Sequence, residues 1–150
     1  MLGKVSVFAQ FVNVFVSPCN IECTNCYIES SPTNDRLVYL TASDVEPYLE
    51  ELDVAGETGI EIGFTGGEPF RAPEMIDILR LVLARGHSVL MLTNAMQPMM
   101  RPHVQDGLLT LNAKYGERLI MRVSLDHYTA PLHDEERGTG AFELAMKGLQ

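Results

Sequence analysis

The fold is decided by residues 60–86, IEIGFTGGEPFRAPEMIDILRLVLARG. This stretch opens with a short apolar run at residues 60–64, which is typical of a buried strand, and a glycine-rich turn follows it. Apolar residues then recur at helical spacing as far as Gly86, a residue type that ends helices. These apolar positions are Met75, Ile78, Leu79, Val82 and Leu83. The stretch therefore predicts one strand followed by one helix that begins near residue 73.

The same strand-and-helix unit recurs further along the chain. Strands that begin near residues 60, 88 and 119 are spaced by about thirty residues, which is the size of one βα unit. The run at residues 88–92 is continuously apolar, so we expect this strand to be covered on both faces. The elements predicted after the first unit are strands at 88–92 and 119–125 and helices within 98–115 and 141–149. Alternating strands and helices predict an α/β fold with parallel strands and right-handed crossovers.

The helix within residues 98–115 has Val104, Leu108 and Leu111 spaced for one face, and Pro102 marks either a break or its true start. Every unusual polar stretch follows a predicted strand. Because chemistry in such sheets gathers at the carboxyl ends of the strands, we expect these stretches to converge on one rim.

The chain before residue 60 predicts one further strand and one further helix. Residues 4–16 are rich in β-branched and aromatic types, so they predict a strand, or two short ones. After a polar loop at residues 30–39, Ser43 and Glu46 offer a capping box for a helix. Its apolar face is expected to comprise Val45, Leu49, Leu52 and Tyr48, although Pro47 near the first turn weakens this helix.

A loop at residues 19–27, CNIECTNCY, holds all 3 cysteines of the chain. Thiolates are soft ligands that suit iron–sulfur clusters, zinc or copper(I). A closed zinc site takes four protein ligands, whereas three thiolates on a four-iron cluster leave one iron open. The alternatives from the residues alone are a set of buried hydrophobic thiols, or a zinc site completed by one of the 4 histidines.

Size, charge and cysteine usage limit the class of protein. With 150 residues, 46% of them hydrophobic, the chain predicts one globular domain. A net charge of -9 without a basic stripe argues against a nucleic-acid partner. No apolar run is long enough to span a membrane, so no membrane partner is expected. An odd number of cysteines without a cleavable leader predicts a reducing, cytoplasmic location.

The spacing C-x3-C-x2-C, followed after an apolar strand by Thr65-Gly66-Gly67-Glu68-Pro69, resembles the signature of the radical S-adenosylmethionine (radical SAM) enzymes. The resemblance implies a partial (β/α) TIM-like barrel with parallel strands. About four βα units of that core are present. Residues 1–150 would then form the N-terminal portion of the radical SAM core domain, with the C-terminal barrel strands absent.

The resemblance also implies the cofactors. Cys19, Cys23 and Cys26 would bind a [4Fe–4S] cluster, and SAM would bind the open iron. The implied activity is reductive cleavage of SAM and hydrogen-atom abstraction from an unknown substrate, either a peptide or a small metabolite. An electron donor such as flavodoxin or ferredoxin is the implied protein partner. The alternative function is a non-catalytic zinc or redox-thiol metal-binding α/β module.

Further positions are assigned to SAM by the same resemblance. Gly66 and Gly67 would let the backbone approach SAM, Glu68 would accept a hydrogen bond from its ammonium group, and Pro69 would fix the turn. The segment from Ser124 to Arg137 resembles peptide-modifying and sulfatase-maturing members, which implies that Ser124 and Arg137 contact SAM.

Two more residues are carried over from the family. Asn94, at the end of the third strand, is expected to contact SAM or substrate. The position before the last cysteine is usually aromatic in the family but is Asn25 here, so Tyr27 is the candidate for the adenine contact. Without the resemblance, Gly66 and Gly67 read as an ordinary turn and Arg137 as a surface ion pair.

Overall fold

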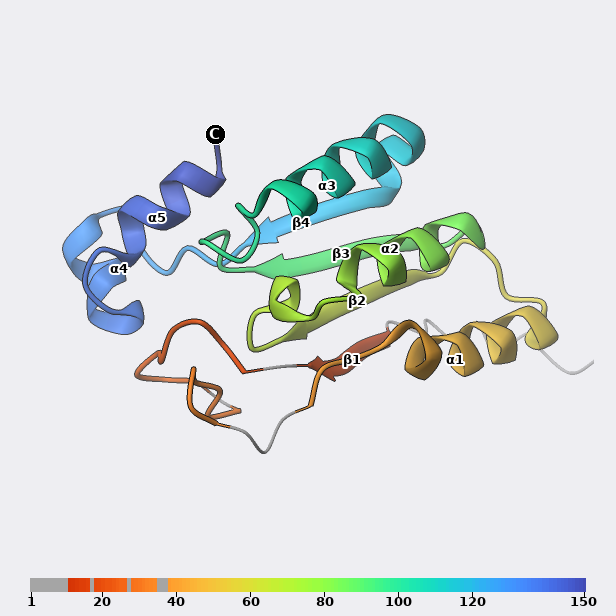
Figure 1. Ribbon diagram of the computed structural model, residues 1–150, viewed down its shortest axis with the longest axis horizontal. Helices are drawn as coiled ribbons and strands as arrows, with labels where there is room; N and C mark the ends of the chain where they lie inside the picture. Colours follow the sequence, from red (N-terminus) through yellow and green to blue (C-terminus); the bar gives the residue numbers. More distant parts are fainter. Residues whose placement is uncertain (1–10, 17, 27, 35–37) are drawn as a thin grey trace, which may run out of the picture.

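The computed structural model describes residues 11–16, 18–26, 28–34 and 38–150, and places four parallel strands in one sheet (Figure 1). The strands are β1 (Phe11–Val16), β2 (Glu61–Gly66), β3 (Ser88–Thr93) and β4 (Leu119–Val123). Their order in the sheet, β1-β2-β3-β4, is also their order in the chain. A sheet wound in one direction is what a barrel requires, so the predicted α/β fold with parallel strands is confirmed. Residues 4–10 of the first predicted strand lie outside the described residues.

Three helices, α1 (Ala42–Ala55), α2 (Met75–Ala84) and α3 (Pro102–Tyr115), lie side by side along one face of this sheet (Figure 1). The apolar face predicted for the second of them is confirmed, because none of its five residues is more than 2% exposed. These side chains pack with Phe64 of β2 and Met91 of β3 in one hydrophobic core. Burial of this stripe holds α2 against β2 and β3.

The opposite face of β3 is less covered than the sequence predicted. Side chains alternate between buried and half-buried along the strand, and Leu90 and Leu92 are half-buried. Successive side chains of a strand point to opposite faces, so these two leucines lie on the face away from the helices. The prediction that β3 is covered on both faces was wrong, because α1, α2 and α3 cover only one face of the sheet.

Helix α1 begins two residues earlier than the predicted capping box. The Asp44 carboxylate accepts hydrogen bonds from the backbone N–H of Thr41, at 2.9 Å, and from its hydroxyl, at 2.6 Å. Thr41 is therefore the N-cap, and the prediction of Ser43 and Glu46 was wrong. The helix also continues through Pro47, and Tyr48, which was expected on the apolar face, is 58% exposed.

The chain ends in two short helices, α4 (Ala130–Arg137) and α5 (Ala141–Gly148), beyond the carboxyl ends of the strands (Figure 1). The sequence predicted α5 but not α4, whose eight residues include only one that is buried, His133. The Asp134 carboxylate joins the two helices, since it accepts from the backbone N–H groups of Gly140 and Phe142 at 2.7 and 2.8 Å. Helix α3 starts at Pro102, so this proline marks the true start of the helix and not a break within it.

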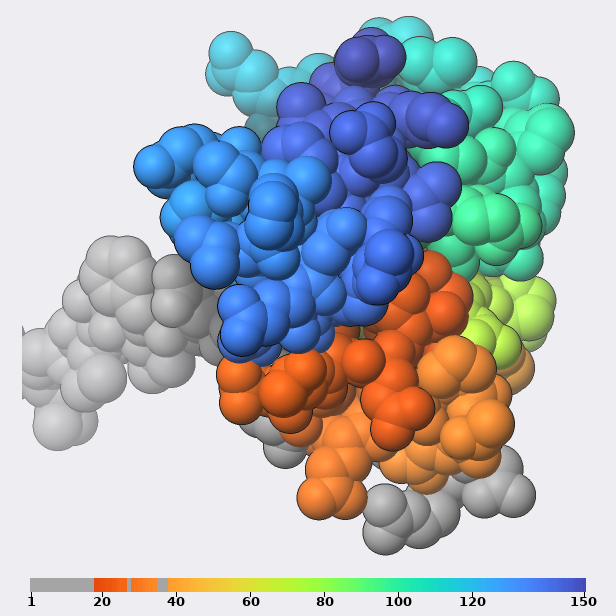
Figure 2. Space-filling view, turned by 90° about the vertical axis from the view of Figure 1, so that its left-hand side faces the viewer, coloured from red at the N-terminus to blue at the C-terminus, as the bar shows by residue number. Residues whose placement is uncertain are grey.

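Viewed from the end where the strands terminate, the cysteine loop and the α4–α5 segment lie against each other (Figure 2). The two segments are far apart in the sequence, yet both extend from the carboxyl end of the sheet. Among the described residues, none of the helices combines the length and the apolarity needed to cross a membrane.

Candidate functional site

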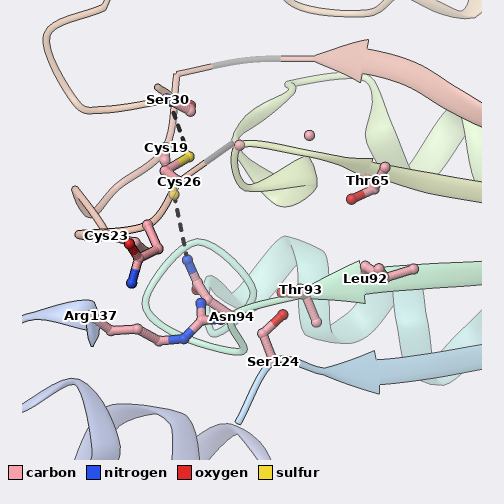
Figure 3. A pocket seen from close by; sticks show the side chains of 13 residues that line it. Cys19, Cys23, Cys26, Ser30, Thr65, Leu92, Thr93, Asn94, Ser124 and Arg137 are labelled. Carbon is pink, nitrogen blue, oxygen red and sulfur yellow. Dashed lines mark hydrogen bonds between the residues drawn. The ribbon is translucent and has the colours of Figure 1, made fainter. Parts of the chain in front are cut away.

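A pocket of about 220 Å³ lies at the carboxyl ends of the strands (Figure 3). It brings together eight of the residues predicted from the sequence, which lie at or after the carboxyl ends of four different strands. They are Cys19, Cys23, Cys26, Gly66, Gly67, Asn94, Ser124 and Arg137. The convergence of the polar stretches on one rim is therefore confirmed.

The three thiols are free and face this pocket together. Cys19 is 7% exposed, and Cys23 and Cys26 are half-buried. Burial raises the pKa of the Cys19 thiol, against a lowering by the backbone N–H of Ile21. Burial also raises the pKa of Cys23, and the nearby charge of Arg137 opposes this rise. Both thiols must release a proton when they bind a metal, since the thiolate is the ligand.

Two further groups donate toward the sulfur atoms. The backbone N–H of Ser30 donates to Cys26 Sγ at 3.3 Å, and Asn94 Nδ2 lies 3.8 Å from Cys19 Sγ. Asn94 Nδ2 also donates to Asn20 Oδ1 at 2.9 Å, which fixes the amide orientation. Hydrogen bonds to ligand sulfurs tune a bound iron–sulfur cluster, so these groups are suited to such a site.

The donor set of the pocket fits a cluster. Each thiolate of a four-iron cluster binds a different iron, whereas a single metal ion needs all its ligands on one atom. Among the described residues, no group of three or more His, Cys, Asp or Glu side chains lies close enough to hold one metal ion. Three free thiols that line one pocket match the number of thiolates that a four-iron cluster with one open iron takes.

The glycine turn after β2 opens the pocket to backbone contacts. Gly66 has a φ of 131°, a conformation that residues with a Cβ rarely adopt. Gly66 and Gly67 both line the pocket. Because neither residue carries a side chain, the backbone can approach a ligand closely here. Contact of these glycines with SAM stays a prediction.

Glu68 takes a different position from the one expected. Its side chain is fully buried and accepts hydrogen bonds from Thr93 Oγ1 at 2.9 Å and from the backbone N–H groups of Asn94 and Phe70 at 2.8 and 3.2 Å. Burial raises the pKa of this carboxyl, and these donors oppose the rise. Neither Glu68 nor the buried Pro69 is among the described residues that line the pocket. Glu68 thus joins the end of β2 to the end of β3.

Arg137 reaches the pocket from the end of α4. Its guanidinium donates to both carboxylate oxygens of Asp126, with Nη2 lying 3.2 Å from Oδ1. The pKa of the Asp126 carboxyl is held below its usual range by this hydrogen bond. The ion pair is therefore present, but the arginine is only 16% exposed and faces the pocket, unlike a surface pair.

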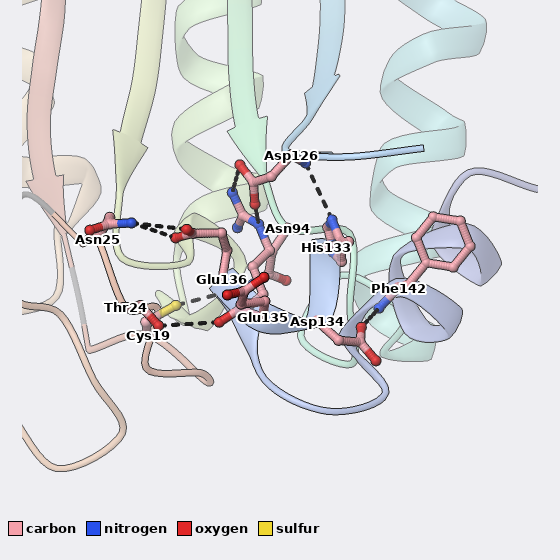
Figure 4. Close-up of polar contacts among 11 residues, drawn as sticks. Cys19, Thr24, Asn25, Asn94, Asp126, His133, Asp134, Glu135, Glu136 and Phe142 are labelled. Carbon is pink, nitrogen blue, oxygen red and sulfur yellow. Dashed lines mark hydrogen bonds and ion pairs between the residues drawn. The ribbon is translucent and has the colours of Figure 1, made fainter. Parts of the chain in front are cut away.

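The sequence reasoning missed contacts between the cysteine loop and α4 (Figure 4). Thr24 donates from its backbone N–H to Glu136 O at 2.9 Å and from its hydroxyl to Glu135 O at 3.3 Å. The Asn25 side chain donates to the Glu136 carboxylate. The sequence did indicate that position 25 is unusual, because Asn25 stands where the family usually has an aromatic residue. It did not reveal the partner, because Glu136 lies 111 residues away in the chain. Tyr27, the candidate for the adenine contact, lies outside the described residues.

Other pocket residues were also missed, namely Ser30, Thr65, Leu92 and Thr93. Three of them, Thr65, Leu92 and Thr93, stand at the carboxyl ends of β2 and β3, and this position at strand ends was the signal that could have identified them.

Comparison with known proteins identifies the family. Residues 14–150 match the model of the radical SAM superfamily. The chain belongs to this superfamily. Its cofactors are those of the radical SAM family, a [4Fe–4S] cluster and S-adenosylmethionine.

Characterised relatives of this radical SAM chain are enzymes of varied function. The antilisterial bacteriocin subtilosin biosynthesis protein AlbA of Bacillus subtilis is 31% identical over 134 residues, which are 88% of this chain and 28% of AlbA. The AdoMet-dependent heme synthase of Methanosarcina barkeri is 29% identical, covering 88% of this chain and 35% of the synthase. The mycofactocin maturase MftC of Mycobacterium tuberculosis is 27% identical, covering 88% and 31%. The chain thus spans about a third or less of their length.

Solved structures show the same fold. Streptococcus suis SuiB superimposes with a TM-score of 0.68 at 20% identity, over 89% of this chain and 27% of SuiB. The structure of SuiB bound to its precursor peptide SuiA gives a TM-score of 0.69 at 21% identity, over 89% and 27%. The predicted partial barrel is therefore confirmed.

Proposed function

We propose that residues 1–150 form the N-terminal portion of the core domain of a radical SAM enzyme and hold its cluster and its SAM. One observation carries the proposal. Three free thiols, two glycines at a strand end, Asn94, Ser124 and Arg137 line a single pocket. The later strands of the barrel are proposed to lie outside this chain, because the relatives are about three times as long.

When bound, the cluster supplies the one electron that cleaves SAM into methionine and a 5′-deoxyadenosyl radical, which takes a hydrogen atom from the substrate. Cys19, Cys23 and Cys26 would hold three irons. Cys19 is 7% exposed, so water has little access to this thiol.

The remaining pocket residues would bind and orient SAM. Gly66 and Gly67 expose backbone groups to the methionyl end, and Arg137, already held by Asp126, offers a fixed positive charge to its carboxylate. Ser124 and Asn94 add polar contacts from β4 and β3. For Glu68 we propose an indirect part, because its carboxylate holds the backbone of Asn94 beside the pocket. Tyr27 remains the proposed adenine contact.

We propose a peptide as the substrate, ahead of a small metabolite. AlbA acts in subtilosin biosynthesis, and SuiB has been solved with its precursor peptide. The electron donor is proposed to be a small redox protein such as flavodoxin or ferredoxin. A cytoplasmic location follows from the same proposal, since three free thiols persist in a reducing compartment.

Anaerobic iron–sulfur reconstitution tests the proposal, followed by electron paramagnetic resonance of the reduced protein with and without SAM. We expect about four irons per chain and a signal that shifts when SAM is added. Cys26→Ala should lose this signal, whereas Thr33→Ala, an exposed position in the same loop region, should keep it. Zinc binding without any cluster signal would replace the proposal with the metal-binding module.

A further inference from the structure

A second pocket, of about 390 Å³, lies beside the first, and we name it the arginine pocket. Its polar lining consists of Arg71, Arg101, Asn20, Tyr39 and Gln97. We propose that the arginine pocket is an anion-binding subsite for a carboxylate or phosphate group. The proposal rests on the described residues of this pocket and does not depend on the cluster.

Both guanidinium groups in this pocket are anchored on neutral carbonyl oxygens. Arg71 Nη1 donates to Cys19 O at 2.7 Å. Arg101 donates from Nε to Pro98 O at 3.0 Å and from Nη2 to Phe70 O. A guanidinium carries five N–H donors, so each side chain is fixed in place with donors left for a ligand.

In the part of the chain that the structure describes, no carboxylate oxygen lies within 4.0 Å of either guanidinium. The charge of Arg101 acts at longer range on the buried Glu68 carboxylate, whose pKa it helps to lower, and Glu68 does not line this pocket. Arg80, Arg85 and Arg137, by contrast, each pair with a carboxylate. Two positive charges that share one pocket repel each other and favour an anion between them. The pocket therefore carries two positive charges on a chain whose net charge is -9.

The other lining groups suit the same ligand class. The side-chain amides of Asn20 and Gln97 and the hydroxyl of Tyr39 are neutral donors that can complete the coordination of an anionic oxygen. Carboxylate and phosphate groups match the planar fork of a guanidinium, which binds two of their oxygens at once.

The arginine pocket also contacts the cysteine loop. Arg71 holds the carbonyl of Cys19, and Asn20, the next residue, accepts from Asn94 at 2.9 Å. An anion bound to Arg71 would therefore lie next to the first cysteine in the chain. The arginine pocket is separate from the thiol pocket, because the two share no lining residue.

The test uses the metal-free chain, so that it is independent of the proposed cluster function. Isothermal titration calorimetry would measure inorganic phosphate and, separately, acetyl-(Glu)3-amide at constant ionic strength. We expect at least one probe to bind, and Arg71→Gln and Arg101→Gln to weaken that binding at least tenfold. Arg80→Gln removes the same charge from the exposed face of α2 and should leave binding unchanged. Binding of phosphate alone identifies a phosphate ligand, and binding of the peptide identifies an acidic polypeptide segment.

Arg101 also donates to backbone carbonyls, so Arg101→Gln could lose binding because it unfolds. A second variant separates loss of the anion site from loss of folding. Gln97→Glu changes an exposed side chain and brings a carboxylate into the pocket without removing an arginine contact. We expect it to weaken binding of either probe at least tenfold while the protein stays folded. Absence of binding by both probes, unchanged binding in Gln97→Glu, or an equal loss in Arg80→Gln would each overturn the proposal.

Discussion

The side-chain amide of Asn25 donates hydrogen bonds to both carboxylate oxygens of Glu136, at 3.0 and 2.7 Å. Asn25 belongs to the loop that follows β1, and Glu136 belongs to the helix that follows β4. These strands are the two edges of the sheet. The contact therefore connects the two ends of an open sheet across the rim of the thiol pocket, with Cys26 and Arg137 as the next residues in the chain.

Substitution of Asn25 by Ala should loosen the cysteine loop. Asn25 is exposed and Glu136 is half-buried, so we expect the charge-assisted hydrogen bond to contribute about 1 kcal/mol, and its loss to make local opening roughly fivefold faster. Hydrogen exchange of residues 23–26 should rise by that factor, measured by mass spectrometry on the metal-free chain. Asn112→Ala, at an exposed position of α3, serves as the control. Unchanged exchange in Asn25→Ala would contradict a positioning role.

The ion pair between Asp126 and Arg137 predicts a pH dependence of stability. Because Arg137 lowers the pKa of Asp126 in the folded state, the pair stabilises the fold above the ordinary pKa of aspartate, and this stability is lost as pH falls through the lowered value. Asp126→Asn should therefore cost up to about 1 kcal/mol at neutral pH, since a partly exposed pair is screened by solvent.

Urea unfolding of the wild type and of Asp126→Asn from pH 7 into the acid range measures this difference. We expect the two free energies of unfolding to converge in acid. A difference that is constant with pH would mean that the substitution acts through something other than the charge of Asp126.

The repeating strands and helices could be predicted from the sequence, whereas the side-chain contacts that join them could not. The strand at 60–64 and the apolar stripe from Met75 to Leu83 were predictable because burial imposes a period on the chain. Helix α4 could not be predicted, because it is mostly polar and has one buried residue, His133, which gives no apolar period. The positions of Glu68 and Asn25 depend on partners 26 and 111 residues away, which no local pattern encodes.

Glu68→Gln tests whether this carboxylate stabilises the strand ends. An amide can present one oxygen to Thr93, Asn94 and Phe70, and its NH2 group would face donors where the second oxygen now accepts. We expect a loss of about 2–3 kcal/mol in the free energy of unfolding, because buried donors are left without acceptors. The exposed Glu50→Gln in α1 should change stability by less than about 0.5 kcal/mol. A stable Glu68→Gln protein would argue that this residue acts on a ligand alone.

Two helical glycines predict opposite tolerance to alanine. A Cβ at Gly148 of α5 would overlap the backbone oxygen of Ala95 and lie 2.7 Å from its Cβ, whereas a Cβ at Gly107 of α3 meets only the side chain of Ile76, with Cγ2 at 2.6 Å. A side chain can rotate away and a backbone carbonyl cannot. Ala95 is already constrained, since its φ of 56° is unfavourable for a residue with a Cβ.

Gly148→Ala should therefore lower the free energy of unfolding by about 1–3 kcal/mol, as overpacking does. Gly107→Ala gains helix propensity of roughly 0.5–1 kcal/mol, which offsets most of its repacking. Urea unfolding of both variants measures the contrast. Because Ala95 follows Asn94, Gly148→Ala should also speed hydrogen exchange at residues 94–96 beside the thiol pocket, and Gly107→Ala should not. Equal stability of the two variants would show that the contact of α5 with this loop yields easily.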